Sequence, residues 1–224
     1  MPPPPAIRTD TFRGPISMRN ALAPLSHTLN LGTPVAYRRN AEIFGEKEPA
    51  DYAYRVISGG VRTYNILDNG RRQIGGFHLP GDIFGLLEFG GEYTFSADAI
   101  SDTRVLVFKR KTLAMLAVRH PAVARELFTF TGRELRRVQD HVLLLIKSAQ
   151  ERIASFLLEM AERTCADNIV ELPVSRQDIA DYLGLTIETV SRTLTILEGT
   201  DSIELSTSRR IVLRNRSALR RLNS

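Results

Sequence analysis

Cysteine is almost absent from this chain, and that scarcity excludes a fold held together by disulfide bonds. Cys165 is the one cysteine among 224 residues, so no internal disulfide can form, and such usage fits a reducing cytoplasm. Long apolar runs are missing too, since none approaches the roughly 20 residues that a membrane-spanning helix requires. The proline-rich start lacks the apolar core of a signal peptide. The sequence therefore predicts a cytoplasmic protein that does not contact membranes, with a flexible lead-in over residues 1–20.

Signals of metal binding and of catalysis are also missing. The four histidines do not have the spacing of metal ligands; they are His27, His78, His120 and His141. The sequence contains no phosphate-binding glycine loop and no hydrolytic triad, so we expect neither an enzyme nor a metal site. Haem ligation by His78 stays open as an alternative to an ordinary surface or core histidine.

Positive charge, by contrast, is in excess. The formal net charge of +5 and the isoelectric point near 9.6 agree with a polyanionic partner. From Ser206 to Ser224 there are six arginines and no acidic residue; the arginines are Arg209, Arg210, Arg214, Arg216, Arg220 and Arg221. Such a run fits either a solvated tail or a surface that contacts phosphates.

Residues 175–194 have the pattern of two short helices joined by a tight turn. Gly184 lies where the chain must turn, and glycine tolerates the positive φ that other residues resist. Thr186 is placed to cap the second helix. Apolar residues recur on the inner faces of both helices; they are Ile179, Ala180, Leu183, Leu185, Val190 and Leu194. The pattern predicts a helix-turn-helix, whose second helix lies in the DNA major groove.

The predicted second helix has polar side chains on its outer face. Glu188 can accept a hydrogen bond from a cytosine amino group, and Arg192 can donate two to one guanine. We expect Ser191, Thr189 and Ile187 to shape the same contact, with Ile187 against a thymine methyl group. The alternative is that Glu188 and Arg192, four residues apart, form an ordinary surface ion pair worth a few tenths of a kcal/mol.

Contacts to DNA phosphates are expected from the residues that begin the two helices. Ser175, Arg176 and Gln177 open the first helix, and Thr186 opens the second. Residues 202–205 and 210–213 read as strands that would form, with residues 170–172, the small sheet of a winged helix. Arg209, at the tip of that wing, is also placed to meet a phosphate.

The quoted residues resemble one family of bacterial regulators. Residues 176–180 and 184–192 are similar to the cyclic-AMP receptor protein/FNR superfamily of transcription regulators, and the combination of Glu188, Ser191 and Arg192 resembles its FNR and FixK branch. The resemblance extends from about residue 21 to residue 215. It implies a homodimer that binds palindromic, TTGAT-like half-sites in double-stranded DNA, recruits RNA polymerase mainly as an activator, and controls microaerobic respiration, denitrification or nitrogen fixation.

The N-terminal half shows short runs rich in β-branched and aromatic residues. They span residues 35–37, 52–57, 60–67, 71–77, 94–100 and 104–108. Asn69-Gly70 between two of these runs predicts a hairpin with a type I′ turn. Closely spaced strands of this kind predict a small barrel or jelly roll. The resembled family uses that fold as a sensing domain.

Residues 122–145 change to a helical period, with a further helix over 149–163 and a hinge near 145–149. Apolar or small side chains recur alternately every three and four residues, as in a coiled-coil seam; they are Phe128, Thr131, Leu135, Val138, Val142 and Leu145. One interpretation is an amphipathic helix that lies on its own domain. We favour a parallel homodimer, because reading a palindrome needs two copies of the reader.

The predicted architecture is therefore α+β. Residues 21–120 form a β-roll or jelly-roll domain that resembles cyclic-nucleotide-binding domains. Residues 121–147 form the dimerisation helix, and residues 148–224 form the winged helix-turn-helix.

The family's ligand residues are not found in this sequence. By the resemblance, Leu86 stands where cyclic-nucleotide binders have a glutamate and Phe95 where they have an arginine, and no cysteine cluster precedes Cys165. An unpaired buried phosphate would be costly, so we expect no cyclic AMP, no iron–sulfur centre and no other cofactor. Two alternatives stay open: a regulator gated by a ligand such as a cyclic nucleotide or haem in an atypical pocket, and a β domain that binds proteins while the basic tail binds nucleic acid nonspecifically. Cys165 is either a modest redox sensor or an inert side chain.

Overall fold

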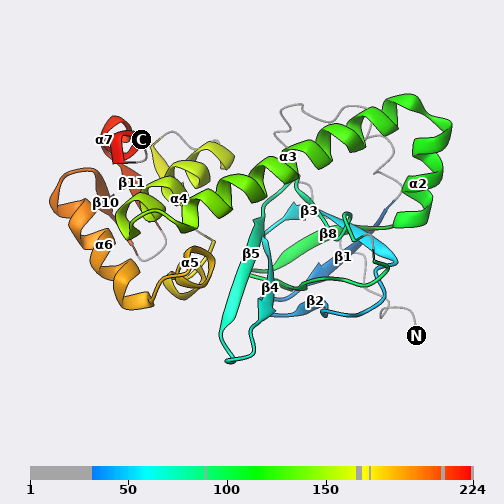
Figure 1. The fold of residues 1–224 in the computed structure, drawn as a ribbon, viewed down its shortest axis with the longest axis horizontal. Helices are drawn as coiled ribbons and strands as arrows, with labels where there is room; N and C mark the ends of the chain where they lie inside the picture. The colour runs from blue at the N-terminus through cyan, green and yellow to red at the C-terminus, as the bar shows by residue number, and fades with distance from the viewer. Residues whose placement is uncertain (1–31, 89, 165–167, 172, 208–209, 223–224) are drawn as a thin grey trace.

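One long helix joins the two folded ends of the chain (Figure 1). The computed structural model describes residues 32–88, 90–164, 168–171, 173–207 and 210–222. The predicted flexible lead-in, Cys165 and Arg209 therefore lie outside the described residues.

The N-terminal end consists of two antiparallel four-stranded sheets. One has the order β1-β8-β3-β6 and the other β2-β7-β4-β5. The strands are β1 (Thr33–Tyr37), β2 (Glu42–Phe44), β3 (Tyr52–Ser58), β4 (Val61–Ile66), β5 (Arg72–His78), β6 (Ile83–Phe84), β7 (Ser96–Ala99) and β8 (Thr103–Lys109). Aromatic rings fill the core of this β-roll: Phe44 packs on Tyr54, Phe84 and Tyr93 at centroid distances of 5.4, 6.0 and 3.7 Å.

Residues 67–71 join β4 to β5, which pair antiparallel, so the predicted hairpin is confirmed but its predicted type I′ turn is wrong. Gly70 has a φ of +76°, whereas Asn69 is not among the described residues with positive φ. The Leu67 carbonyl accepts from the Gly70 N–H at 2.8 Å, and the Leu67 N–H donates to the Arg71 carbonyl. A turn followed by a left-handed glycine needs positive φ at Gly70 alone, so Asn69 acts instead through its side chain, which accepts from the Arg71 N–H at 3.0 Å.

Two helices follow the β-roll, of which sequence analysis predicted the second. Helix α2 (Arg110–Arg119) was not predicted, nor were the short strands β2 and β6. The apolar periodicity of α2 is weak, and Leu113 is the one buried residue of this helix. The backbone is extended at His120, so α2 ends there, and Pro121 begins α3 (Pro121–Leu145). The missing N–H of proline costs no hydrogen bond at this position, because the first N–H groups of a helix have no partner within it.

The C-terminal end is a winged helix. Helix α4 (Ala149–Arg163) begins at a Ser148–Glu151 capping box after the predicted hinge. Helices α5 (Arg176–Leu183) and α6 (Ile187–Gly199) follow β9 (Ile169–Glu171), and β10 (Ile203–Leu205) and β11 (Arg210–Leu213) complete a sheet of order β10-β11-β9. The arginine-rich end continues past β11 into α7 (Arg216–Leu222), whose Leu219 is fully buried. It is therefore a folded element and not a solvated tail.

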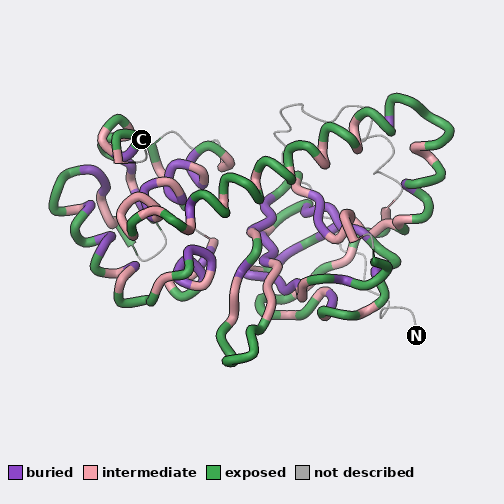
Figure 2. The backbone as a smooth tube through the Cα atoms, in the orientation of Figure 1, coloured by how far each residue is buried: buried purple, intermediate pink, exposed green. Residues whose placement is uncertain are grey.

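A cluster of buried apolar residues joins β5 to the winged helix, apart from the aromatic core of the β-roll. Figure 2 shows buried stretches of backbone at both ends of the molecule. Phe77 on β5 contacts Phe156 of α4 and Tyr182 of α5, with ring centroids 6.2 and 5.1 Å apart. The predicted α+β class, with a β-roll before a winged helix-turn-helix, is confirmed. In the part of the chain that the structure describes, no helix is both long and apolar enough to cross a membrane.

Candidate nucleic-acid interface

Helix α5 is fixed at both ends by local signals in the sequence. The Ser175 hydroxyl accepts from the Asp178 N–H at 3.1 Å, and the Asp178 carboxylate accepts from the Ser175 N–H at 2.9 Å. This capping box satisfies backbone donors that the first helical turn leaves open. At the other end Gly184 adopts a φ of +63°, and the next N–H, that of Leu185, returns to the Ala180 carbonyl. The left-handed glycine turns the chain directly into α6.

Helix α6 packs one side against α5 and leaves the other open. Thr186 caps it by accepting from the Thr189 N–H at 3.2 Å. Its inner side is buried through Val190, Thr193, Leu194 and Leu197. The packing of two helices through these residues gives the predicted helix-turn-helix.

The outer side of α6 carries the predicted base-reading residues. Ile187, Glu188 and Arg192 are exposed, whereas Thr189 and Ser191 are half-buried. The backbone N–H of Glu188 and the Thr186 hydroxyl lower the pKa of Glu188, so it is ionised near neutral pH. Across the described residues no ion pair joins Glu188 to Arg192. Both charged groups are therefore open to a partner.

The predicted phosphate contacts at the start of α5 already have partners within the protein. Arg176 donates to the Ser191 hydroxyl at 3.3 Å, which ties the first helix to the second. The Gln177 amide donates to Asp181 at 2.7 Å. A guanidinium has five N–H donors, so Arg176 retains donors for a further acceptor. The predicted contact by Arg209 lies outside the described residues.

A buried ion network that no sequence pattern indicated holds α5 against the β-roll. Arg62 on β4 donates to Asp98 on β7 at 2.7 Å and to Asp178 on α5 at 2.5 Å. Burial opposes ionisation of Asp178, but hydrogen bonds from Ser175 and the charges of Arg62 and Arg72 together lower its pKa. The capping position of Asp178 is visible in the sequence, whereas its arginine partners are more than 100 residues away.

Arg72 on β5 extends this network to the middle of α5. Its guanidinium donates to Asp178 at 2.7 Å and, through Nε, to Asp181 at 2.8 Å. Asp181 thus accepts from both domains, because Gln177 donates to its other oxygen. The network fixes the direction in which α5, and with it α6, faces.

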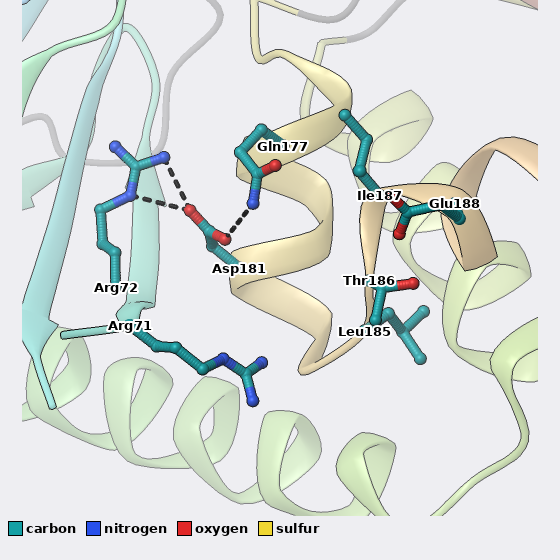
Figure 3. Close-up of a pocket in the computed structure, with 8 residues that line it drawn as sticks. All are labelled: Arg71, Arg72, Gln177, Asp181, Leu185, Thr186, Ile187 and Glu188. Carbon is teal, nitrogen blue, oxygen red and sulfur yellow. Dashed lines mark hydrogen bonds and ion pairs between the residues drawn. The ribbon is translucent and has the colours of Figure 1, made fainter. Parts of the chain in front are cut away.

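A cleft of about 410 Å³ lies between the β4–β5 hairpin and the turn of the helix-turn-helix. Figure 3 shows residues from both sides of it, with Arg72 and Gln177 directed at Asp181. The lining residues are Arg71, Arg72, Gln177, Asp181, Leu185, Thr186, Ile187 and Glu188. The cleft therefore adjoins residues predicted to contact DNA.

Leu86 and Phe95, at the two positions that the family resemblance equates with nucleotide-binding residues, are half-buried against other residues of the protein. Leu86 packs against the cluster of Ile83, Leu113 and Val123. The ring of Phe95 lies so near Gly75 that a Cβ there would be 2.8 Å from it. Among the described residues, no three His, Cys, Asp or Glu side chains are grouped as metal ligands. His78 is buried, bonded to Thr63 and stacked on Phe84 at 5.1 Å, as an ordinary core histidine is.

Helix α3 leaves most of its predicted seam uncovered. Phe128 is 82% exposed, and Leu135, Val138 and Val142 are between 57% and 58% exposed. Thr131 and Leu145 are only half-buried at the same face, with the Thr131 hydroxyl bonded to the Leu127 carbonyl. Ile146, directly after α3, was not part of the predicted seam; it is 81% exposed. With Phe128, Leu135, Val138 and Val142 it forms the exposed apolar stripe of α3.

Comparisons with known proteins agree with this architecture. A cyclic nucleotide-binding domain matches residues 34–120, and a Crp-like helix-turn-helix domain matches residues 151–222. The nitrogen fixation regulation protein FixK of Azorhizobium caulinodans is 47% identical over 99% of this chain and 92% of its own length. The chain belongs to the CRP/FNR family. Within that family it groups with the FixK-type transcription regulators.

Two further relatives place the chain within the CRP/FNR family. The structure of FixK2 from Bradyrhizobium japonicum has 50% identity and a TM-score of 0.83, covering 87% of this chain and 98% of that one. The transcriptional activator protein FnrA of Stutzerimonas stutzeri is 37% identical over 76% of this chain and 72% of its own length. The predicted resemblance to the FNR and FixK branch is confirmed.

Proposed function

We propose that the protein binds a palindromic operator as a homodimer and activates transcription from it. The single observation that carries this proposal is the outer side of α6, where Glu188 and Arg192 are exposed and joined by no ion pair. They lie on a helix whose inner side is packed and whose first turn is capped. A helix held in this way can enter the major groove with its polar side against base edges.

Direct readout comes from three side chains of α6. Arg192 donates two hydrogen bonds to a guanine, and Glu188 accepts from a cytosine amino group. Ile187, at the first turn, packs on a thymine methyl group. Thr189 and Ser191 shape the surface between them. A TTGAT half-site offers these groups on its two strands, and it is the target that the family resemblance implies.

Phosphate contacts fix the register of the helix on the duplex. Ser175, Arg176 and Gln177 at the start of α5 and Thr186 at the start of α6 present donors on one edge of the helix-turn-helix. Arg209 of the wing, outside the described residues, belongs to the same proposed set. These contacts add affinity without sequence preference.

The exposed stripe of α3 is the proposed dimer interface. Phe128, Leu135, Val138, Val142 and Ile146 are apolar side chains that a single chain leaves in water. Pairing two α3 helices in parallel would bury them and place two α6 helices roughly 34 Å apart, one helical turn of DNA. The dimer therefore supplies the twofold symmetry of the operator.

The names of the relatives support a biological role for this protein. Their names assign nitrogen fixation regulation and transcriptional activation to FixK and FnrA proteins. We propose that this protein acts in the bacterial cytoplasm, recruits RNA polymerase, and controls microaerobic, anaerobic or nitrogen-fixation genes without a small-molecule cofactor.

Arg192→Ala tests the proposed readout. On a duplex with two TTGAT-like half-sites the variant should lose about 1–3 kcal/mol of binding free energy, whereas binding to scrambled DNA should stay unchanged. Arg119→Ala on α2 is a matched control, because it removes the same charge at an exposed site far from α6 (Figure 1). Equal losses by Arg192→Ala on both duplexes would show that Arg192 contacts phosphate and reads no base.

A further inference from the structure

Arg71, directly before β5, and Arg72, the first residue of β5, have different surroundings. The Arg72 guanidinium donates hydrogen bonds to Asp178 and Asp181. The Arg71 side chain is exposed, and none of the described residues forms a hydrogen bond or ion pair with it. Its backbone is nevertheless fixed, since its N–H donates to Asn69 and its carbonyl accepts from Leu67. Arg71 is thus an exposed cation, with no side-chain partner among the described residues, on a hairpin whose backbone is hydrogen-bonded.

Arg71 points into the cleft between the domains. Figure 3 shows its side chain extending from the hairpin past Asp181 toward the α5–α6 turn. Gln177 and Thr186, two of the proposed phosphate contacts, line the same cleft. A DNA strand whose phosphates contact Gln177 and Thr186 would therefore pass close to the Arg71 side chain.

Arg71 does not form an ion pair with the nearby carboxylate of Asp181. Asp181 accepts from Arg72 at 2.8 Å and from Gln177 at 2.7 Å, so its negative charge already has donors from both domains. Glu188, the other acidic residue at the cleft, belongs to the proposed base-reading set. An anion on the hairpin side of the cleft would thus meet an uncompensated guanidinium, which suits a phosphate oxygen.

We propose that Arg71 is a further DNA-backbone contact, supplied by the β-roll domain and not by the helix-turn-helix. The inference rests on the proposed function, since it assumes that α6 docks in the groove. Its consequence is that full affinity requires the two domains to hold their present arrangement. The Arg62–Asp178 and Arg72–Asp181 pairs set that arrangement. The β-roll would thereby contribute to DNA binding without any ligand.

The experiment compares wild type, Arg71→Ala and the matched control Arg119→Ala on matched and scrambled duplexes across a salt series. Arg71→Ala should weaken binding to both duplexes by the same factor. It should also reduce the steepness with which the logarithm of the association constant falls with the logarithm of salt concentration, by about two per dimer, because each protomer loses one phosphate contact. Arg71→Lys should keep most of that slope, because it retains the charge. Thermal unfolding should be unchanged in every variant, since Arg71 has no side-chain partner in the described protein.

Two failures can be told apart. If wild type prefers the matched duplex but Arg71→Ala has the salt slope of Arg119→Ala, the Arg71 contact is wrong and the proposed function stands. If wild type shows no preference for the matched duplex, the proposed function itself fails. Loss of matched binding alone by Arg71→Ala would contradict a backbone contact, because phosphates carry no sequence information directly.

Discussion

The Arg62 guanidinium and the Asp178 carboxylate, 116 residues apart in the chain, lie 2.5 Å from each other across the domain boundary. Both side chains are largely withdrawn from solvent, at 10% and 6% exposure. Asp178 also caps the first helix of the helix-turn-helix through Ser175. One carboxylate therefore starts the DNA-binding motif and anchors it to the β-roll.

Asp178→Asn should destabilise the protein and weaken the contact between the β-roll and the winged helix. Removing one partner of a buried pair typically costs about 3–5 kcal/mol, because the arginine is left buried without its counter-charge. Urea unfolding measures the loss. Asp68→Asn, at the exposed hairpin tip, is the matched control and should change little. A midpoint equal to that of wild type would mean that the network contributes no stability.

Gly184→Ala should destabilise the turn between α5 and α6. A φ of +63° costs alanine roughly 1–2 kcal/mol, although no clash is expected since the nearest atom to an added Cβ is 3.6 Å away. Gly199→Ala, in the last position of α6 with open space around it, should be neutral or gain up to about 1 kcal/mol. Chemical denaturation of both variants gives the comparison. The same direction of change in the two would refute the conformational explanation.

Leu135→Arg should convert the proposed dimer to a monomer. A charge in the middle of the α3 seam cannot be buried against its own copy without a partner. Sedimentation velocity would report the mass and circular dichroism the retained helix content. Val118→Arg, at an apolar site of α2 that is more exposed than Leu135, should leave the dimer intact. A Leu135→Arg protein that still sediments as a dimer would place the interface elsewhere.

His78 should make stability depend on pH between about 4 and 6.5. Burial lowers the pKa of His78 to about 4, below the value near 6.5 of an unfolded chain. A depressed pKa contributes stability that is fully present above the unfolded value and is lost as the pH falls toward the folded one, at up to about 1.4 kcal/mol per pH unit. Urea titrations of wild type and His78→Gln at pH 7, 6 and 5 check this. Parallel pH profiles for the two proteins would show that His78 is not the titrating group.

Local signals explain why the helix-turn-helix could be predicted from sequence. Ser175, Gly184 and Thr186 act on backbone groups within four residues of themselves, so their roles are visible in the chain. The seam of α3 was visible for the same reason, because helical spacing alone brings its members to one face.

The rest depended on long-range packing. Nothing near Arg62 in sequence indicates that it would meet Asp178, and nothing near Arg71 indicates that it would face Thr186 across a cleft. Helix α2 was missed because Leu113 is its single buried residue and its apolar periodicity is weak. The turn at Asn69 was misjudged because the loop length of the hairpin, and not the dipeptide, selects the turn type.

The measurement that tests the central claim most directly is selection of bound duplexes from random DNA by the purified protein without any added small molecule. We expect recovery of a palindrome with TTGAT-like half-sites spaced for two α6 helices, and loss of the preference for one base pair in each half-site with Arg192→Ala. Recovery of DNA with no shared sequence, or of an asymmetric single site, would contradict a paired reader that uses α6.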